Sequence, residues 1–97
     1  MKPAAFASAA HAELQAAAVY YEREQRGLGR RFAIAVEETV TRVCRQPSVY
    51  RIVEADIRKC RVRRFPYAVI FREQTDSIQV LAVMHLHRQP GYWRERA

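Results

Sequence analysis

The sequence predicts an α+β domain, and three observations carry that prediction. Two successive segments in the first half of the chain have apolar residues at helical spacing. After residue 56 the apolar residues recur at every second position, which is the spacing of β-strands. With 97 residues the chain is long enough for one domain and not for two, so we expect residues 1–97 to form a single domain.

A short edge strand and two helices are expected in the N-terminal half. Residues 4–7 are suited to the strand, and Ser8 is a suitable cap for the first helix. The apolar stripe of this helix consists of Ala10, Leu14, Ala17, Ala18 and Tyr21. Its charged residues Glu13, Glu22, Arg23 and Glu24 are expected to face solvent.

The second helix begins at the turn that contains Gly27 and Gly29, and it ends before Pro47. Its apolar stripe consists of Leu28, Phe32, Ala35, Val36, Val40 and Val43. Two amphipathic helices that are joined by a glycine-containing turn predict an antiparallel helical hairpin.

The second half predicts a loop and then three strands. Residues 47–56 are polar and irregular and are expected to form the loop, and the strands are expected at 57–65, 67–71 and 78–84. Consecutive strands after two helices favour an antiparallel meander with the hairpin packed on one face. The order is then strand, helix, helix, three strands and a short C-terminal helix or tail.

The first of these strands carries a basic ladder. Its alternation turns Cys60 and Val62 to one face and Lys59, Arg61 and Arg63 to the other. We therefore expect the sheet face opposite the helices to be partly open and basic. Both cysteines, Cys44 and Cys60, lie on apolar phases and are expected to be buried free thiols.

The positive charge is concentrated in one part of the chain. Residues 1–56 carry eight Lys and Arg side chains against seven Asp and Glu, whereas residues 57–97 carry nine against three. This asymmetry indicates a polyanionic partner, either nucleic acid or an acidic protein segment, with a solubilising surface as the alternative. No apolar run is long enough to span a membrane, and we expect a cytoplasmic protein.

Three stretches of the sequence resemble the RelE/ParE toxin superfamily, and its ParE-like branch most closely. They are Tyr20-Tyr21-Glu22 with Gly27-Leu28-Gly29-Arg30-Arg31-Phe32, Arg63–Phe71, and Val80–His85 followed by Arg88 and Trp93. The resemblance implies a toxin of a type II toxin–antitoxin system that a cognate antitoxin neutralises, in a hetero-oligomer and without a cofactor.

The resemblance leaves two activities open, because this fold carries both. ParE-like members bind and inhibit DNA gyrase without being enzymes, whereas RelE-like members cut messenger RNA on the ribosome. A member that binds its antitoxin but has lost toxicity is a third possibility. We favour the gyrase inhibitor, because Ala68 stands where the nucleases carry a phosphate-binding arginine on the central strand.

Two residue sets follow from the resemblance. The catalytic residues of the ribonuclease alternative would be Arg61, Arg63, His85, His87, Arg88 and Tyr92. The residues expected to bind antitoxin or target are Lys59, Arg61, Arg63, Arg64, Arg88 and Trp93. The basic ladder suits nucleic-acid phosphates and antitoxin carboxylates equally.

The two histidines at the end of the last strand allow three interpretations. His85 and His87 are two residues apart on a strand, so both side chains could face the same cleft. Because imidazole titrates near neutral pH, they could act there as general bases. Alternatively they are partly exposed side chains without a catalytic role. A metal site would need a third ligand, and none is apparent, so we expect no metal.

Overall fold

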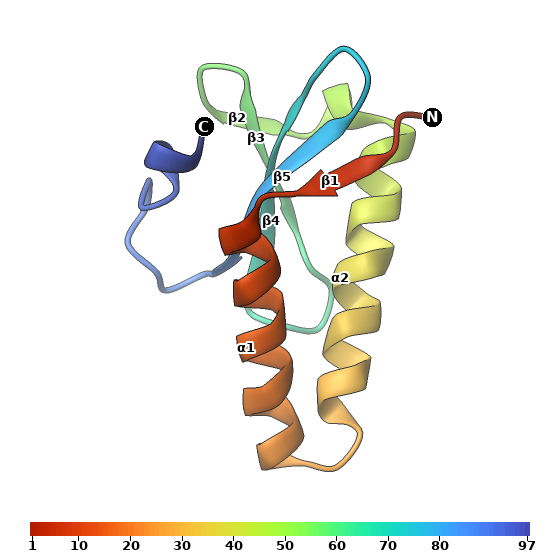
Figure 1. Ribbon diagram of the computed structural model, residues 1–97, viewed down its shortest axis with the longest axis vertical. Helices are drawn as coiled ribbons and strands as arrows, with labels where there is room; N and C mark the ends of the chain where they lie inside the picture. Colours follow the sequence, from red (N-terminus) through yellow and green to blue (C-terminus); the bar gives the residue numbers. More distant parts are fainter.

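The computed structural model describes residues 1–97 and places a long helical hairpin beside a five-stranded sheet (Figure 1). The elements follow the order β1 (Ala4–Phe6), α1 (Ser8–Glu24), α2 (Leu28–Arg45), a 3₁₀ helix (Pro47–Val49), β2 (Arg51–Glu54), β3 (Ile57–Arg61), β4 (Tyr67–Glu73), β5 (Ile78–His85) and a C-terminal 3₁₀ helix (Arg94–Arg96). The predicted α+β class and the helical hairpin are confirmed. Neither helix combines the length and the apolar character that a membrane span requires.

The sheet has the strand order β1-β5-β4-β3-β2. Strands β3, β4 and β5 form the predicted antiparallel meander. Strand β1 pairs in parallel with β5, and β2 pairs antiparallel with β3, so the sheet is mixed rather than purely antiparallel. Because β1 pairs only with Ile78–Val80, the rest of β5 lies at an edge of the sheet.

Three local expectations were wrong. Residues 47–56 contain a 3₁₀ helix and the edge strand β2 instead of a loop, because an edge strand can satisfy half of its backbone groups with water and so carries polar residues. Ala7, and not Ser8, is the N-cap of α1, and no side chain caps this end. Strand β3 ends at Arg61, since Arg64 adopts a left-handed backbone conformation (φ 72°) that turns the chain back.

The main core lies between the hairpin and the sheet. Phe32 of α2 is fully buried, and its ring packs against Tyr21, Phe65 and Tyr67 with centroid separations of 4.8 to 5.1 Å. Cys44 and Cys60 are buried free thiols, as predicted. This aromatic cluster fastens the hairpin to the start of β4.

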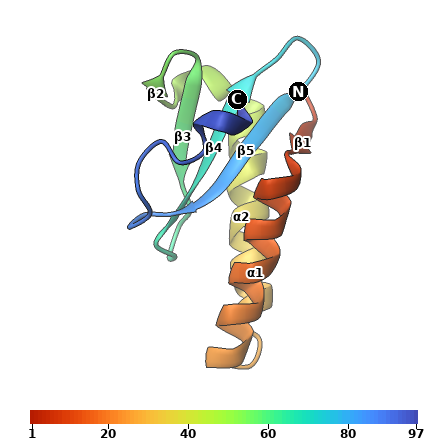
Figure 2. The same cartoon turned by 60° about the vertical axis from the view of Figure 1, so that its left-hand side comes forward.

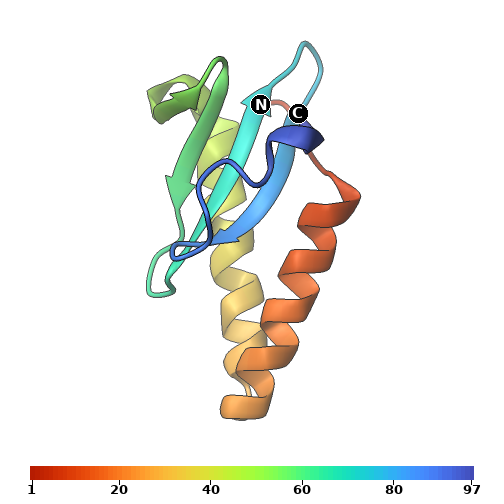
Figure 3. The ribbon, with the colours of Figure 1, turned by 90° about the vertical axis from the view of Figure 1, so that its left-hand side faces the viewer.

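A second apolar cluster covers the opposite face of the sheet. The C-terminal segment, residues 86–97, crosses this face, on the side away from the helices (Figures 2 and 3). Trp93 is only 4% exposed and packs in a cluster with Ile57, Ala68, Ile70, Leu81, Ala82 and Met84. The face expected to be open is therefore largely covered by the chain's own tail.

The hairpin turn depends on Glu22 and Gly29. The Glu22 carboxylate accepts hydrogen bonds from the backbone N–H groups of Gly27 (2.9 Å) and Gly29 (3.1 Å), which lie at the start of α2. A carboxylate at this position also stabilises the positive end of the helix dipole. Gly29 is buried against α1, and a Cβ atom added there would lie 2.3 Å from the Ala18 carbonyl oxygen.

Replacing Gly29 with alanine is expected to lower the free energy of unfolding by about 2 kcal/mol or more, because backbone of α1 must move to admit the methyl group. Urea unfolding followed by circular dichroism measures the loss. Arg30→Ala, at the exposed neighbouring position, is the control and is expected to change stability by less than about 0.5 kcal/mol. Equal stabilities of the two variants would contradict the close approach of the helices.

Candidate protein-binding groove

A hollow of about 620 Å³ lies between α2 and the turn that joins β3 to β4. We call it the α2 groove. Its lining residues are Tyr21, Leu28, Arg31, Ile34, Ala35, Glu38, Arg63, Arg64, Phe65 and Pro66. Ile34 is 42% exposed, which is unusual for a large apolar side chain on a helix that otherwise buries its apolar stripe. The groove therefore offers an apolar surface to a partner.

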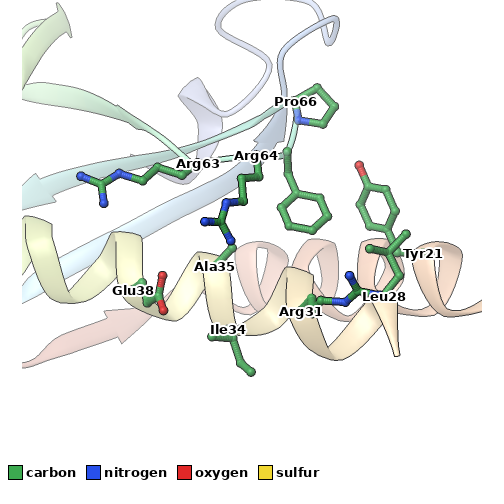
Figure 4. Close-up of a pocket in the computed structure, with 10 residues that line it drawn as sticks. Tyr21, Leu28, Arg31, Ile34, Ala35, Glu38, Arg63, Arg64 and Pro66 are labelled. Atoms are coloured by element: carbon green, nitrogen blue, oxygen red, sulfur yellow. The ribbon is translucent and has the colours of Figure 1, made fainter. Parts of the chain in front are cut away.

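The rim of the α2 groove is basic. Arg63 and Arg64 extend from the turn over α2, while Arg31 extends from α2 itself (Figure 4). Glu38 is the one carboxylate among the lining residues. Three guanidinium groups around an apolar surface favour an amphipathic partner with acidic side chains.

The basic character continues along α2. A neighbouring hollow of about 470 Å³ is lined by Arg42, Arg45 and Arg63, with Glu37 and Glu38 on the same side. Arg63 therefore belongs to the α2 side of the molecule. Lys59 and Arg61 lie instead on the face of the sheet that the C-terminal segment covers. They share this face with Ile57 of the second apolar cluster, because side chains two residues apart on a strand point the same way. The predicted ladder of three cations on one face is corrected, because the strand ends before Arg63.

A hydrogen-bonded cluster around Glu13 holds the tail to α1. The Tyr92 hydroxyl donates to Glu13 Oε2 (2.6 Å), and the Arg96 guanidinium donates to Glu13 Oε1 (2.8 Å). The Val83 N–H of β5 donates to the same oxygen at 3.1 Å. Arg88 stacks on the Tyr92 ring at 4.0 Å and approaches Glu13 to only 3.9 Å. Glu13 was expected in solvent; its side chain is 17% exposed.

Burial, reinforced by the hydrogen bond to Glu13, raises the pKa of the Tyr92 hydroxyl far above its usual value. Tyr92 therefore keeps its proton in alkaline solution as well as at neutral pH, and its hydroxyl donates to Glu13. The hydrogen bond to Glu13 likewise raises the pKa of Arg96. Both residues fasten the tail in this arrangement.

Comparison with known proteins decides the family. Residues 5–90 match the family model described as the ParE toxin of a type II toxin–antitoxin system, parDE. The chain belongs to the ParE toxin family. Among solved structures it is similar to a chain of the chromosomal ParDE toxin–antitoxin system from P. aeruginosa, with a TM-score of 0.74 and 19% identity over 88% of this chain and 96% of that one. A search of curated protein sequences gives no match.

The ParE fold does not bring the six predicted catalytic residues into one cleft. Arg61 lies at the end of β3 on the tail side, and Arg63 lies beside α2. Arg88 and Tyr92 are on the tail at Glu13. Ala68, where the nucleases carry an arginine, is fully buried in the same apolar cluster as Trp93.

His85 and His87 contact each other at the end of β5 of this ParE toxin. The His87 N–H donates to His85 Nδ1 (3.0 Å), and the two rings are 5.1 Å apart. His85 also packs edge-on against Tyr67. No group of three or more His, Cys, Asp or Glu side chains is arranged to hold a metal ion.

The predicted binding residues of the toxin have different surroundings. Arg63 and Arg64 line the α2 groove, whereas Arg88 lies at the tail and is 55% exposed. Trp93 was predicted to bind antitoxin or target, and in the structure its side chain is buried, because the tail folds back over the sheet. Sequence reasoning missed Arg31, Ile34 and Glu38. Ile34 could have been found, since it lies outside the apolar stripe of its helix.

Proposed function

We propose that this ParE toxin binds DNA gyrase in the cytoplasm and inhibits it, and that a cognate antitoxin holds it inactive in a hetero-oligomer. The family supports the toxin role. The observation that favours gyrase over messenger RNA is the covered sheet face at Ala68.

RNA cleavage would need cationic donors around the scissile phosphate and groups that move protons at the ribose and the leaving oxygen. At Ala68 the chain offers only a methyl group, and this methyl group is buried in the apolar cluster that also contains Trp93. The loss of one charge-stabilising donor typically slows catalysis by about 10²–10³-fold. The Tyr92 hydroxyl already donates to Glu13, so the tail would have to rearrange before it could serve a substrate.

The α2 groove suits the neutralising partner. Its exposed Ile34 offers an apolar contact, and Arg31 and Arg64 can pair with carboxylates. An amphipathic antitoxin helix with acidic residues beside its apolar stripe satisfies both requirements. The antitoxin is thereby the polyanionic partner that the charge distribution of the sequence indicates.

Two assays with the purified toxin test the proposal. We expect inhibition of gyrase-catalysed supercoiling of plasmid DNA and no ribosome-dependent cleavage of messenger RNA. Messenger cleavage that Arg88→Ala and Tyr92→Ala abolish would overturn the gyrase proposal. Growth arrest on expression without a response in either assay would exclude both mechanisms.

A binding experiment tests the α2 groove. It uses as the antitoxin the protein encoded by the reading frame beside the toxin gene, chosen because its co-expression restores growth. We expect Arg64→Glu to weaken its binding by about tenfold or more, because a carboxylate then faces an acidic partner. Arg51→Glu makes the same charge change at an exposed residue of β2, outside the groove, and serves as the control. Equal dissociation constants for the two variants would place the antitoxin elsewhere.

A further inference from the structure

Most cations of the C-terminal half of the chain have a partner within the protein. Of the nine Lys and Arg side chains after residue 56, four form ion pairs with carboxylates: Arg72, Arg88, Arg94 and Arg96. The Arg58 guanidinium donates to two backbone carbonyl oxygens, and Arg63 and Arg64 line the α2 groove. The two side chains that remain are Lys59 and Arg61 of β3, which form no ion pair.

A third cation, Arg51 of β2, lies beside these two. In the antiparallel pairing of β2 with β3, Arg51 stands directly opposite Lys59. Residues paired in this way extend from the same face of a sheet, with Cβ atoms about 4.5–5.5 Å apart. Arg61 extends from that face as well, because it lies two residues, or about 7 Å, further along β3. Arg51, Lys59 and Arg61 therefore form one group, which we call the cation cluster.

No carboxylate neutralises the cation cluster. None of its members takes part in the five ion pairs of the protein. On the other side of β3, Ile70 stands opposite Lys59 and Ala68 stands opposite Arg61, so the cross-strand neighbours on β4 are apolar. Like charges that face each other directly on adjacent strands destabilise a sheet. The pair of Arg51 and Lys59 therefore lowers the stability of the free protein, and a bound anion removes their repulsion.

The cation cluster is accessible and presents charge without apolar surface. Arg51 and Arg61 are exposed, and β2 is the last strand of the sheet, at the edge away from β1 (Figure 3). The exposed Ile52 alternates with Arg51 along β2 and extends from the other face. The α2 groove, by contrast, combines its guanidinium groups with the exposed side chain of Ile34. Because charged residues are depleted at the centre of protein interfaces, whereas Lys and Arg bind phosphate backbones, the cluster favours a nucleic acid.

The nearby aromatic rings are not free to stack on unpaired bases. Tyr50 precedes Arg51, but its ring packs against Phe71 in the core between the hairpin and the sheet. Trp93 is buried in the second apolar cluster. Proteins that bind single strands rely on such stacking, whereas a duplex can be held through its phosphates alone. A duplex therefore suits the cluster best, and the DNA on which gyrase acts is one.

We propose that the cation cluster binds the phosphate backbone of double-stranded DNA, and that the toxin in this way contacts the DNA that gyrase holds. DNA is then a second polyanionic partner of the protein, beside the antitoxin at the α2 groove. Phosphate contacts position a protein on a duplex without reading its bases, so the binding is expected to be independent of sequence. The inference rests on the proposed function, since that function names gyrase, but the contact with DNA is measured without the enzyme.

Titration of a short, fluorescently labelled DNA duplex with the purified toxin at several salt concentrations tests the contact. Three phosphate contacts contribute a slope of about −2.7 to the plot of log K against the logarithm of the salt concentration. The double variant Lys59→Ala, Arg61→Ala is expected to make the slope shallower by about two. The control, Arg23→Ala with Arg26→Ala, removes two exposed arginines at the far end of the hairpin and is expected to leave the slope unchanged.

Arg51→Glu provides a second measurement that does not depend on the double variant. A carboxylate opposite Lys59 replaces two like charges by an opposite pair, so the variant is expected to fold with a Tm at or above that of the unmodified protein. Its dissociation constant for the duplex is expected to rise about tenfold or more, because a carboxylate then faces the phosphates.

Equal slopes for the two double variants, or an Arg51→Glu variant that binds the duplex as tightly as the unmodified toxin, would overturn the proposal. Tighter binding of a single-stranded RNA of the same length would exclude duplex DNA as the ligand. A toxin that binds the duplex with the expected slopes but does not inhibit gyrase would support the contact with DNA and count against the proposed function.

Discussion

Replacement of Phe32 by alanine is expected to destabilise the protein by about 3–5 kcal/mol, the usual cost of removing a buried phenylalanine ring from a close-packed core. The ring has no exposed surface and touches three other aromatic side chains, Tyr21, Phe65 and Tyr67. These neighbours come from α1, from the turn between β3 and β4, and from the first residue of β4. A domain of this size has a total stability of roughly 5–15 kcal/mol, so the variant would lose a large fraction of it.

Thermal unfolding followed by circular dichroism measures this loss, and a fall in Tm of roughly 15 °C or more is expected. Ile34→Ala is the matched control, because it lies on the same helix but is 42% exposed. It should cost less than about 1 kcal/mol, as it removes a side chain that is only partly withdrawn from water. A Phe32→Ala variant as stable as Ile34→Ala would refute the aromatic core.

Replacement of Glu13 by alanine is expected to release the C-terminal segment from the sheet. The carboxylate accepts hydrogen bonds from Tyr92, Arg96 and the Val83 N–H, and the guanidinium of Arg96 would lose its anion. A hydrogen bond to a charged group contributes about 1.5–3 kcal/mol, so the equilibrium between closed and open tail should shift about tenfold or more. The indole N–H of Trp93 is buried without a partner, which further favours opening.

Trp93 is the one tryptophan of the chain and reports on the release directly. Its emission should move to longer wavelength in Glu13→Ala, and trypsin should cleave after Arg88 and Arg94 faster than in the unmodified protein. Glu22→Ala removes a carboxylate from the same helix at the far end from the tail and should leave Trp93 emission unchanged. An unshifted emission spectrum in Glu13→Ala would show that apolar packing alone holds the tail.

The sequence predicted the elements whose periodicity is long and regular. The stripe that contains Phe32 specified α2, and the alternation and apolar character of residues 57–84 specified β3, β4 and β5. Strand β2 was missed because it is short and lies at an edge, where polar residues are tolerated on both faces. The parallel pairing of β1 joins residues more than 70 positions apart, and no local pattern encodes it.

The candidate grooves were only partly predictable. Arg63 and Arg64 were predicted to bind a partner because of their charge. Their position beside α2 depends on the left-handed backbone conformation of Arg64, which cannot be predicted from the residue types in this turn. Glu13 was placed in solvent because carboxylates are seldom buried. Its partners, Val83, Tyr92 and Arg96, follow about 70 to 83 residues later, so only the folded chain reveals why a carboxylate is needed there.

The parallel pairing of β1 with β5 also has a consequence for synthesis. Chains are made at about 5–20 residues per second, and β1 is completed roughly 4–15 seconds before its partner strand. During that interval the hairpin can form from local contacts, but the sheet lacks β5, the strand between β4 and β1. The toxin fold therefore assembles only late in translation, so an antitoxin made nearby has several seconds to be present when the complete fold first exists.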